Sequence, residues 1–203
     1  MRLENKKAIV TGGAGGIGRA TALAFAAEGA AVAVVDLRED AALAVVEEIR
    51  AAGGTAVAIA ADVSNEDDIQ RIIATTVEEF GGVNVVFNNA GIIRRTTAVE
   101  TTAEEWDRVF GVNVKSIFLM CKHVVPIMEA NGGGSIVNTG SGWGLKGGGQ
   151  AISMNPINGP LNAGRFILKY GTTTAYNEGD AEDRKSTRLN SSHVRKSRMP
   201  SSA

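Results

Sequence analysis

Continuous hydrophobic runs alternate with amphipathic segments along the first 141 residues. The continuous runs, which are typical of strands buried on both faces, cover residues 8–10, 31–35, 55–61, 83–87 and 135–138. Segments with helical spacing separate them, at residues 16–28, 40–52, 64–80 and onward from 102. Alternating strands and helices predict an α/β fold, in which a parallel sheet of five strands has helices on both faces.

Capping residues predict where two of the helices begin, and apolar positions predict which side of a helix faces the sheet. Ser64 is expected to cap the third helix, and Thr102 with Glu105 has the spacing of a capping box before the fourth. Apolar positions near the i, i+3, i+4 pattern predict which side chains face the sheet. These are Leu43, Val46 and Ile49 in the second helix, and Ile69, Ile72, Ile73, Val77 and Phe80 in the third.

The alternation of strands and helices ends at about residue 141, and the chain is expected to change character after residue 153. Residues 1–153 are expected to form one domain, while residues 154–183 mix prolines and glycines with a single apolar run at 166–168 and are expected to be irregular. Residues 184–203 are almost devoid of apolar side chains. Such a segment buries too little surface to offset its ordering entropy, so it is expected to be disordered.

Charge and cysteine content narrow the classes of protein. The 203 residues include 21 basic and 22 acidic side chains; six of the basic ones lie in residues 184–203, which leaves 15 against 22, or −7, for the rest. An acidic body argues against nucleic-acid binding, and the basic tail lacks interleaved aromatics. One cysteine, Cys121, excludes an intramolecular disulfide, and we expect no metal site. Without a signal peptide or a membrane-length apolar run, we expect a soluble cytoplasmic protein.

The strongest motif is a glycine-rich loop between the first strand and the first helix, Thr11-Gly-Gly-Ala-Gly-Gly-Ile-Gly18. Glycines let a backbone approach a pyrophosphate, and the helix N-terminus attracts its negative charge. Two spacings fit the loop: Gly13, Gly15 and Gly18, or Thr11-Gly12 with Gly16 and Gly18. It is not a P-loop, because Gly18 is followed by Arg19-Ala20. A ligand-free flexible turn is the alternative.

Asp36 ends the second strand, 20 residues after Gly16. An acid at this distance is expected to accept hydrogen bonds from an adenosine ribose and to repel a 2′-phosphate, which favours NAD over NADP. Leu37 and Arg38 follow it; a nearby arginine can accommodate the extra phosphate, so NADP stays possible. A helix cap or a solvated turn carboxylate is the alternative role for Asp36.

Five motifs in order then resemble the short-chain dehydrogenase/reductase family, in the manner of the 3-oxoacyl-acyl-carrier-protein reductases. They are Thr11-Gly-x-x-x-Gly16-x-Gly18, Asp62-Val63, Asn88-Asn-Ala-Gly91, Asn113 within Val112-Asn-Val114, and Ser141 after Ile136-Val-Asn-Thr139. The resemblance implies a doubly wound Rossmann fold with strand order 3-2-1-4-5. It also implies a nicotinamide-dependent oxidoreductase that acts on a small-molecule alcohol or carbonyl compound, commonly as a homo-oligomer.

The resemblance carries site roles to matching positions. Ser141 would orient the substrate oxygen and Asn113 would hold a water of the proton relay. A kinked helix with a satisfied amide is a structural role for Asn113 that is compatible with the relay. The remaining positions would bind the cofactor: Thr11, Gly12, Gly15, Gly16, Ile17, Gly18, Asp36, Leu37, Arg38, Asp62, Val63, Asn89, Ala90, Gly91 and Thr139. By the same resemblance, Asp62 and Val63 would line the adenine pocket, and Asn89 to Gly91 would lie under the nicotinamide-side ribose.

The family's catalytic Tyr-x-x-x-Lys pair has no counterpart where it belongs. Thirteen residues after Ser141 stands Met154, and four further stands Asn158. A thioether has no exchangeable proton and an amide has no charge. The two tyrosines, Tyr170 and Tyr176, lack a lysine four residues on. The alternative to an active oxidoreductase is therefore an inactive dinucleotide-binding fragment or pseudoenzyme.

The match to the family ends abruptly at Ser153, which suggests a truncated or chimeric chain. Residues 183–193 and 197–203 look like a translated sequencing-adapter oligonucleotide, with residues 194–196 as its variable index. On this hypothesis residues 184–203 are a non-native tail and do not contribute to the fold. Genomic DNA containing those codons in frame would refute it.

Overall fold

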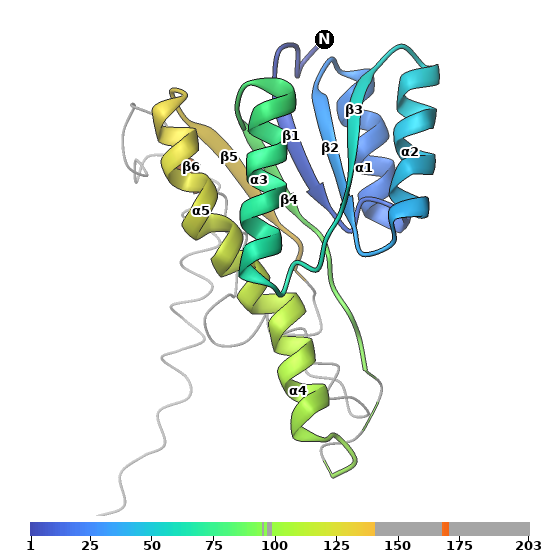
Figure 1. Ribbon diagram of the computed structural model, residues 1–203, viewed down its shortest axis with the longest axis vertical. Helices are drawn as coiled ribbons and strands as arrows, with labels where there is room; N and C mark the ends of the chain where they lie inside the picture. The colour runs from blue at the N-terminus through green and yellow to red at the C-terminus, as the bar shows by residue number, and fades with distance from the viewer. Residues whose placement is uncertain (95, 97–98, 141–167, 171–203) are drawn as a thin grey trace, which may run out of the picture. The chain divides into compact units, whose positions relative to one another are not determined.

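The computed structural model describes residues 1–94, 96, 99–140 and 168–170. Ser141, Met154, Asn158 and the segments predicted to be irregular or a tail lie outside these residues, apart from a short strand at 168–170. All described residues belong to one compact unit, Met1–Gly171. Figure 1 labels its helices and strands.

A single sheet organises the described chain (Figure 1). Its strands are β1 (Lys7–Thr11), β2 (Ala31–Asp36), β3 (Thr55–Ala60), β4 (Val85–Asn88), β5 (Gly134–Asn138) and β6 (Leu168–Tyr170). The order is β3-β2-β1-β4-β5-β6. The first five strands are parallel in the predicted order 3-2-1-4-5, which confirms the doubly wound fold.

The sixth strand was not foreseen. β6 pairs antiparallel with β5, with Ile136 opposite Leu168 and Gly134 opposite Tyr170. The sequence placed this stretch in a segment expected to be irregular, because three residues are too few to show an alternating pattern. The sheet therefore has six strands in the described residues rather than five.

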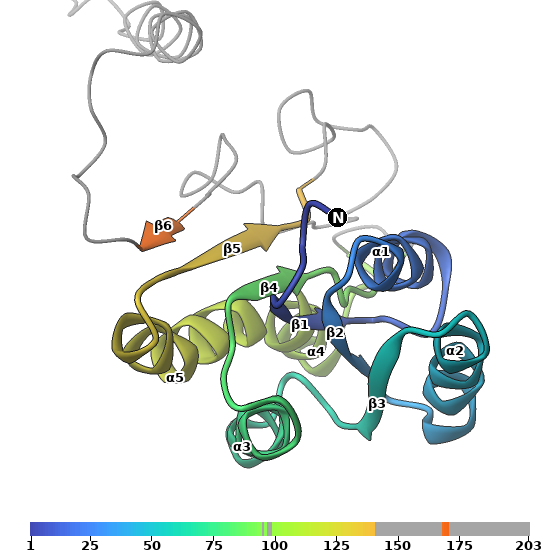
Figure 2. The ribbon, with the colours of Figure 1, turned by 90° about the horizontal axis from the view of Figure 1, so that it is seen from above.

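The helices lie in two layers. α1 (Gly16–Ala27) and α2 (Glu39–Ala51) cover one face, and α3 (Glu66–Phe80) and α5 (Ser116–Ala130) cover the other (Figure 2). α4 (Ala103–Phe110) leads into α5 through a π-helical turn, η1 (Gly111–Lys115). The capping box predicted at Thr102 and Glu105 opens α4.

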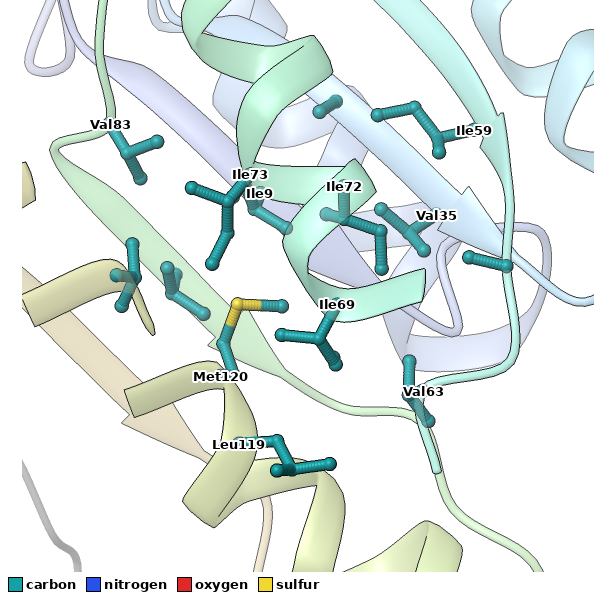
Figure 3. Close-up of a cluster of buried hydrophobic side chains, with 14 of the residues drawn as sticks. Ile9, Val35, Ile59, Val63, Ile69, Ile72, Ile73, Val83, Leu119 and Met120 are labelled. Atoms are coloured by element: carbon teal, nitrogen blue, oxygen red, sulfur yellow. The ribbon is translucent and has the colours of Figure 1, made fainter. Parts of the chain in front are cut away.

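Side-chain alternation along the strands explains the two layers. Ala8 and Val10 point to the α1/α2 side, whereas Ile9 points to the α3/α5 side. β2 divides its residues the same way and is buried throughout its interior. On the α3/α5 side, Leu119 and Met120 of α5 lie beside Ile69 of α3 (Figure 3). The core predicted for α3 is confirmed, with Ile69, Ile72 and Ile73 buried.

Two local predictions were wrong. Leu43 is 43% exposed, because the buried stripe of α2 is offset from it and consists of Ala42, Val45, Val46 and Ile49. Ser64 does not cap α3. Asn65 does, and its side chain accepts hydrogen bonds from the amides of Asp67 and Asp68, at 2.8 and 3.3 Å.

The continuous helix Ala103–Ala130 is the one stretch of the described chain long and apolar enough, by length and composition alone, to cross a membrane. Leu119, Met120, Val124 and Met128 from this stretch are buried in the core against the sheet and α3.

Candidate functional site: the carboxyl edge of the parallel sheet

The loop between β1 and α1 follows the second of the two predicted glycine spacings. Gly12 and Gly16 have positive φ angles, of 61° and 50°, which disfavour any side chain. A β-carbon at Gly18 would overlap the carbonyl oxygen of Gly12 and approach the Asn89 amide. Gly15 has an extended φ of −153° and open space around it. Conformation and packing therefore require glycine at 12, 16 and 18, but not at 15.

Thr11 joins the ends of β1 and β4. Its buried hydroxyl accepts hydrogen bonds from the amides of Asn89 and Ala90, at 3.0 and 3.1 Å. The Asn89 side chain returns hydrogen bonds to the carbonyl oxygens of Thr11 and Gly12, at 3.2 and 3.3 Å. Asn89 thus holds the glycine loop against β4, which is a positioning role that the sequence did not reveal.

The end of β5 joins the same network. The Thr139 amide donates to the Asn88 carbonyl at 2.9 Å, and its hydroxyl donates to the Asn89 side-chain oxygen at 3.4 Å. The amide groups of Asn88 and Asn138 also bond across the strands at 2.8 Å. Of these three asparagines, only Asn89 was predicted as a site residue. Asparagines at the ends of adjacent parallel strands are a sequence signal that could have indicated the other two.

Asp36 lies beside the glycine loop. One carboxylate oxygen accepts a hydrogen bond from the Ala14 amide at 3.1 Å, and the other accepts one from the Arg38 amide at 3.3 Å. The carboxylate is therefore held in place by two backbone donors. A carboxylate offers about four acceptor positions, so Asp36 can accept further hydrogen bonds.

The turn after β3 is anchored by charged side chains. The Asp62 side chain accepts hydrogen bonds from the amide and the hydroxyl of Ser64, at 2.9 and 2.7 Å. The Asp62 amide donates to Asp68 at 2.8 Å. The Arg71 guanidinium lowers the pKa of Asp68, and the bond from the Asp62 amide lowers it further. Asp68 is therefore a stable anion that fixes this turn.

Asn113 lies in η1 and is buried, with 3% of its surface exposed. Its side-chain oxygen accepts a hydrogen bond from the Ile92 amide at 2.8 Å, and its amide nitrogen donates to the Ile92 carbonyl at 2.9 Å. Both polar atoms are satisfied by one backbone residue. The geometry fits an irregular helix with a hydrogen-bonded amide, a structural role that is compatible with the expected one in the proton relay. This amide fixes the helix to the segment after β4.

These segments surround a cavity of about 220 Å³ at the carboxyl edge, where the loops to α3 and α4 leave the sheet (Figure 1). Seven predicted cofactor residues line it, namely Gly12, Asp36, Leu37, Asp62, Val63, Ala90 and Gly91. Lining residues that were not predicted include Ser64, Ile92, Arg108 and Val112. Because parallel strands end at one edge, residues far apart in sequence meet there.

Other predicted site residues stand apart from this cavity. Ile17 is 66% exposed on the first turn of α1, and Thr139 lies at the end of β5. Ser141 lies outside the described residues. On α5, His123 contacts Glu66, and burial raises the pKa of the Cys121 thiol.

The strand order, the helix layers and the glycine loop together define a Rossmann-type α/β protein. The chain belongs to the short-chain dehydrogenase family, whose sequence profile matches residues 6–153. A crystal structure of a short-chain dehydrogenase/reductase from Burkholderia xenovorans is similar to it, with a TM-score of 0.72 and 37% identity over 77% of this chain and 65% of that one.

Among characterised relatives, the chain is 45% identical over 140 residues to a 2,5-dichloro-2,5-cyclohexadiene-1,4-diol dehydrogenase of Sphingobium indicum, covering 69% of this chain and 56% of that enzyme. It is 36% identical over 193 residues to a cyclohexanol dehydrogenase of Acinetobacter sp., covering 95% and 73%. It is 39% identical to a 3-oxoacyl-acyl-carrier-protein reductase of Thermotoga maritima, covering 72% and 60%. The chain thus spans little more than half the length of the first of these relatives.

Proposed function

We propose that the protein is an NAD-preferring oxidoreductase that binds its dinucleotide along the carboxyl edge of the sheet and acts on a small-molecule alcohol or carbonyl compound. The observation that carries the proposal is the convergence of the glycine loop, Asp36 and the Asp62 turn on one cavity. Members of the family generally use NAD or NADP. The bound nicotinamide would supply or accept the hydride.

The glycine loop suits a pyrophosphate. α1 begins at Gly16 and has no acidic residue in its first turn, so its N-terminal amides and the positive end of its dipole stay free for an anion. The close approach of Gly18 to Gly12 keeps the loop tight. Backbone amides, rather than side chains, would bind the phosphates here.

The adenosine ribose would lie against Asp36. Its carboxylate is already oriented by Ala14 and Arg38 and has acceptor capacity left for the two hydroxyl groups. The same negative charge opposes a 2′-phosphate, which supports the preference for NAD. The Arg38 side chain, which is exposed, keeps NADP a possible second cofactor.

The adenine base would occupy the 220 Å³ cavity. Complete sites for small molecules usually measure ~300–1,000 Å³, so this cavity suits one part of a dinucleotide. Val63, Ile92 and Val112 supply apolar walls. Asn89, Ala90 and Gly91 follow β4, where the nicotinamide-side ribose would lie, and Thr139 and Ser141 follow β5.

Cyclic secondary alcohols are the first substrates to test. Two relatives are named as dehydrogenases of a cyclohexadiene diol and of cyclohexanol. In this proposal Ser141 orients the substrate oxygen. We further expect a soluble, cytoplasmic homo-oligomer that binds neither nucleic acid nor membranes.

A second candidate function is dinucleotide binding without turnover. It rests on Met154 and Asn158, which stand at the positions of the family's tyrosine and lysine. Neither side chain can transfer a proton or lower the pKa of a neighbouring hydroxyl.

The two candidates separate in one experiment on the full chain. NADH binding is measured by the enhancement of its fluorescence, and turnover by the change in NADH absorbance with cyclohexanol and NAD. Binding with turnover supports the oxidoreductase, and binding alone supports the second candidate. Absence of NADH binding at millimolar concentration would refute both.

A further inference from the structure

Arg108 lies between two hollows of the surface. It lines the 220 Å³ cavity and also an open groove of about 610 Å³ that follows the exposed side of α4, η1 and the start of α5. Ser64 is the other residue that lines both. Arg108 and Ser64 therefore form the outer margin of the cavity, where it meets solvent.

The backbone that carries Arg108 is fixed relative to the cavity. Val112, four residues after Arg108, also lines the cavity. The next residue, Asn113, makes two side-chain hydrogen bonds to the backbone of Ile92, at 2.8 and 2.9 Å. A β-carbon at Gly111 would lie 3.4 Å from the β-carbon of Ser64, so the helix passes close to the Asp62 turn. Arg108 thus lines the cavity from α4, on a backbone that these contacts hold in place.

The guanidinium of Arg108 has no partner in the described part of the chain, where it makes neither a hydrogen bond nor an ion pair. Arg2, Arg19 and Arg71 each pair with a carboxylate, and Arg50 donates to the carbonyl of Ala56. An exposed arginine at a cavity margin, without a protein partner, is available to a ligand.

The apolar lining of the cavity suits a flat aromatic ring, and a planar group suits the remaining face of that ring. Its inner walls are Val35, Val63, Ile92 and Val112, which can hold the flat faces of an aromatic ring but leave its outer side open. A guanidinium is itself planar and stacks on aromatic faces, whereas the compact ammonium group of lysine is attracted to such a face only as a point charge.

We propose that Arg108 closes the adenine pocket by stacking its guanidinium on the outer face of the base. The inference rests on the proposed dinucleotide site. It adds a residue on α4 to the base-binding wall, and it predicts that the plane of the side chain matters as well as its charge.

The test is calorimetric titration of the full chain with NADH and with ADP-ribose. Arg108→Ala is expected to weaken both ligands by about tenfold, and by the same factor, because the contact is to the shared adenine. Arg108→Lys keeps the charge but loses the planar contact, so it is expected to recover only part of the lost affinity. Lys115→Ala is the matched control, since Lys115 lines the groove but not the cavity, and it is expected to bind within twofold of wild type.

The salt dependence of binding is a second measurement. It distinguishes stacking on the base from a long-range attraction between Arg108 and the pyrophosphate. The ratio of affinities between wild type and Arg108→Ala should stay constant as sodium chloride is raised, whereas a long-range charge effect is screened and the ratio would approach one. Unchanged affinity in Arg108→Ala, or full recovery in Arg108→Lys, overturns the inference while leaving the proposed function intact. A wild-type chain that binds neither ligand overturns both.

Discussion

Gly18 is the residue at which the glycine loop is least tolerant of change. It belongs to α1, and the space that a side chain would need is filled by the Gly12 carbonyl and the Asn89 amide. Gly15, three residues earlier, is also a glycine, but a β-carbon built on it would have no neighbour within 4 Å. The two positions offer a matched pair for testing whether loop geometry, rather than glycine content, makes the site.

Replacing Gly18 by alanine should destabilise the protein and prevent dinucleotide binding. The backbone atoms of Gly12 cannot move without shifting β1, so the strain is expected to cost about 1–3 kcal/mol of unfolding free energy. Thermal unfolding and NADH titration measure the two effects. Gly15→Ala should leave the melting temperature close to that of wild type. An equal loss of stability in the two variants would contradict this account of the loop.

Asp36 accepts a hydrogen bond from the Ala14 amide and also carries a negative charge, and a single substitution can separate these two roles. Asp36→Asn keeps an oxygen that can accept the Ala14 amide but removes the negative charge. The ratio of NADPH to NADH affinity should therefore rise by at least about tenfold, because the repulsion of a 2′-phosphate is lost.

The control for Asp36 is Asp40→Asn. Asp40 is an exposed acid in the first turn of α2 and carries the same charge nearby. Titration of both dinucleotides should show little change in their affinity ratio. If Asp40→Asn changed the ratio as much as Asp36→Asn, the preference would come from the general field of the protein.

At the scale of elements, α3 and α5 are joined by an ionic cluster at the start of α3. Glu66 is the first residue of α3, and one of its carboxylate oxygens lies 2.7 Å from both Lys122 and His123 of α5. The hydrogen bond from Lys122, and then that from His123, hold the pKa of Glu66 below its ordinary value of 4.5. The carboxylate is partly exposed, so solvent moderates its contribution.

The cluster predicts a pH dependence with a definite sign. A carboxyl group whose pKa is lowered by folding stabilises the folded state above its unfolded pKa, and loses that contribution as the pH falls through its folded pKa. Glu66→Gln should therefore lower the melting temperature near neutral pH, and the difference from wild type should shrink below pH 4.5.

Asp67→Asn is the control for Glu66, because Asp67 shares the first turn of α3 and its interaction with the helix dipole. Its side chain makes no ion pair in the described part of the chain. Melting curves across the acid range should show a smaller effect at neutral pH than for Glu66→Gln. A difference between Glu66→Gln and wild type that grows in acid would contradict the assignment.

The sequence predicted elements better than it predicted the contacts between them. Continuous apolar runs and glycine stops located the five parallel strands, because burial on both faces leaves a local pattern. The cap of α3 was placed at Ser64 rather than Asn65, since both residue types cap helices and only geometry decides. β6 has no local signal, because it depends on pairing with β5. The asparagine in an apolar run indicated a kinked helix at Asn113, but not that its amide bonds to Ile92.

At the scale of the whole molecule, the sheet brings the ends of five strands to one edge. Thr11, Asp36, Asp62, Asn89 and Thr139 each follow or end a different parallel strand. The family resemblance identified these positions, but not that Asn89 positions Thr11 or that Arg108 completes the cavity. Such contacts depend on side-chain direction in three dimensions, which periodicity does not encode.

The face of the sheet under α1 and α2 is covered unevenly. These helices bury Ala8, Val32 and Val34 on β1 and β2. Farther along the same sheet, Val85 and Phe87 of β4 are only partly buried, and Val137 of β5 is 37% exposed. Within the described residues, α1 and α2 therefore cover this face over β1 and β2 better than over β4 and β5.

The two candidate functions differ in proton transfer, so restoring the family's pair is the decisive change to the whole protein. Met154→Tyr together with Asn158→Lys is expected to raise turnover of cyclohexanol with NAD by about a hundredfold or more over wild type, which is the usual contribution of a positioned general acid or base. The lysine is needed because an unperturbed tyrosine has a pKa of ~10 and exchanges its proton slowly at neutral pH. Each single variant should therefore gain much less than the pair, because the two groups act as a unit.

Steady-state rates of NADH formation measure the gain, and NADH affinity measured in parallel shows whether the dinucleotide site is intact. Adding Gly18→Ala to the pair should abolish the gained activity, since the pair acts only on a substrate held beside the bound nicotinamide. If the double variant binds NADH as well as wild type and is no faster, positions 154 and 158 do not stand where the family places its tyrosine and lysine. Proton transfer would then have to come from a residue that the family motif does not identify.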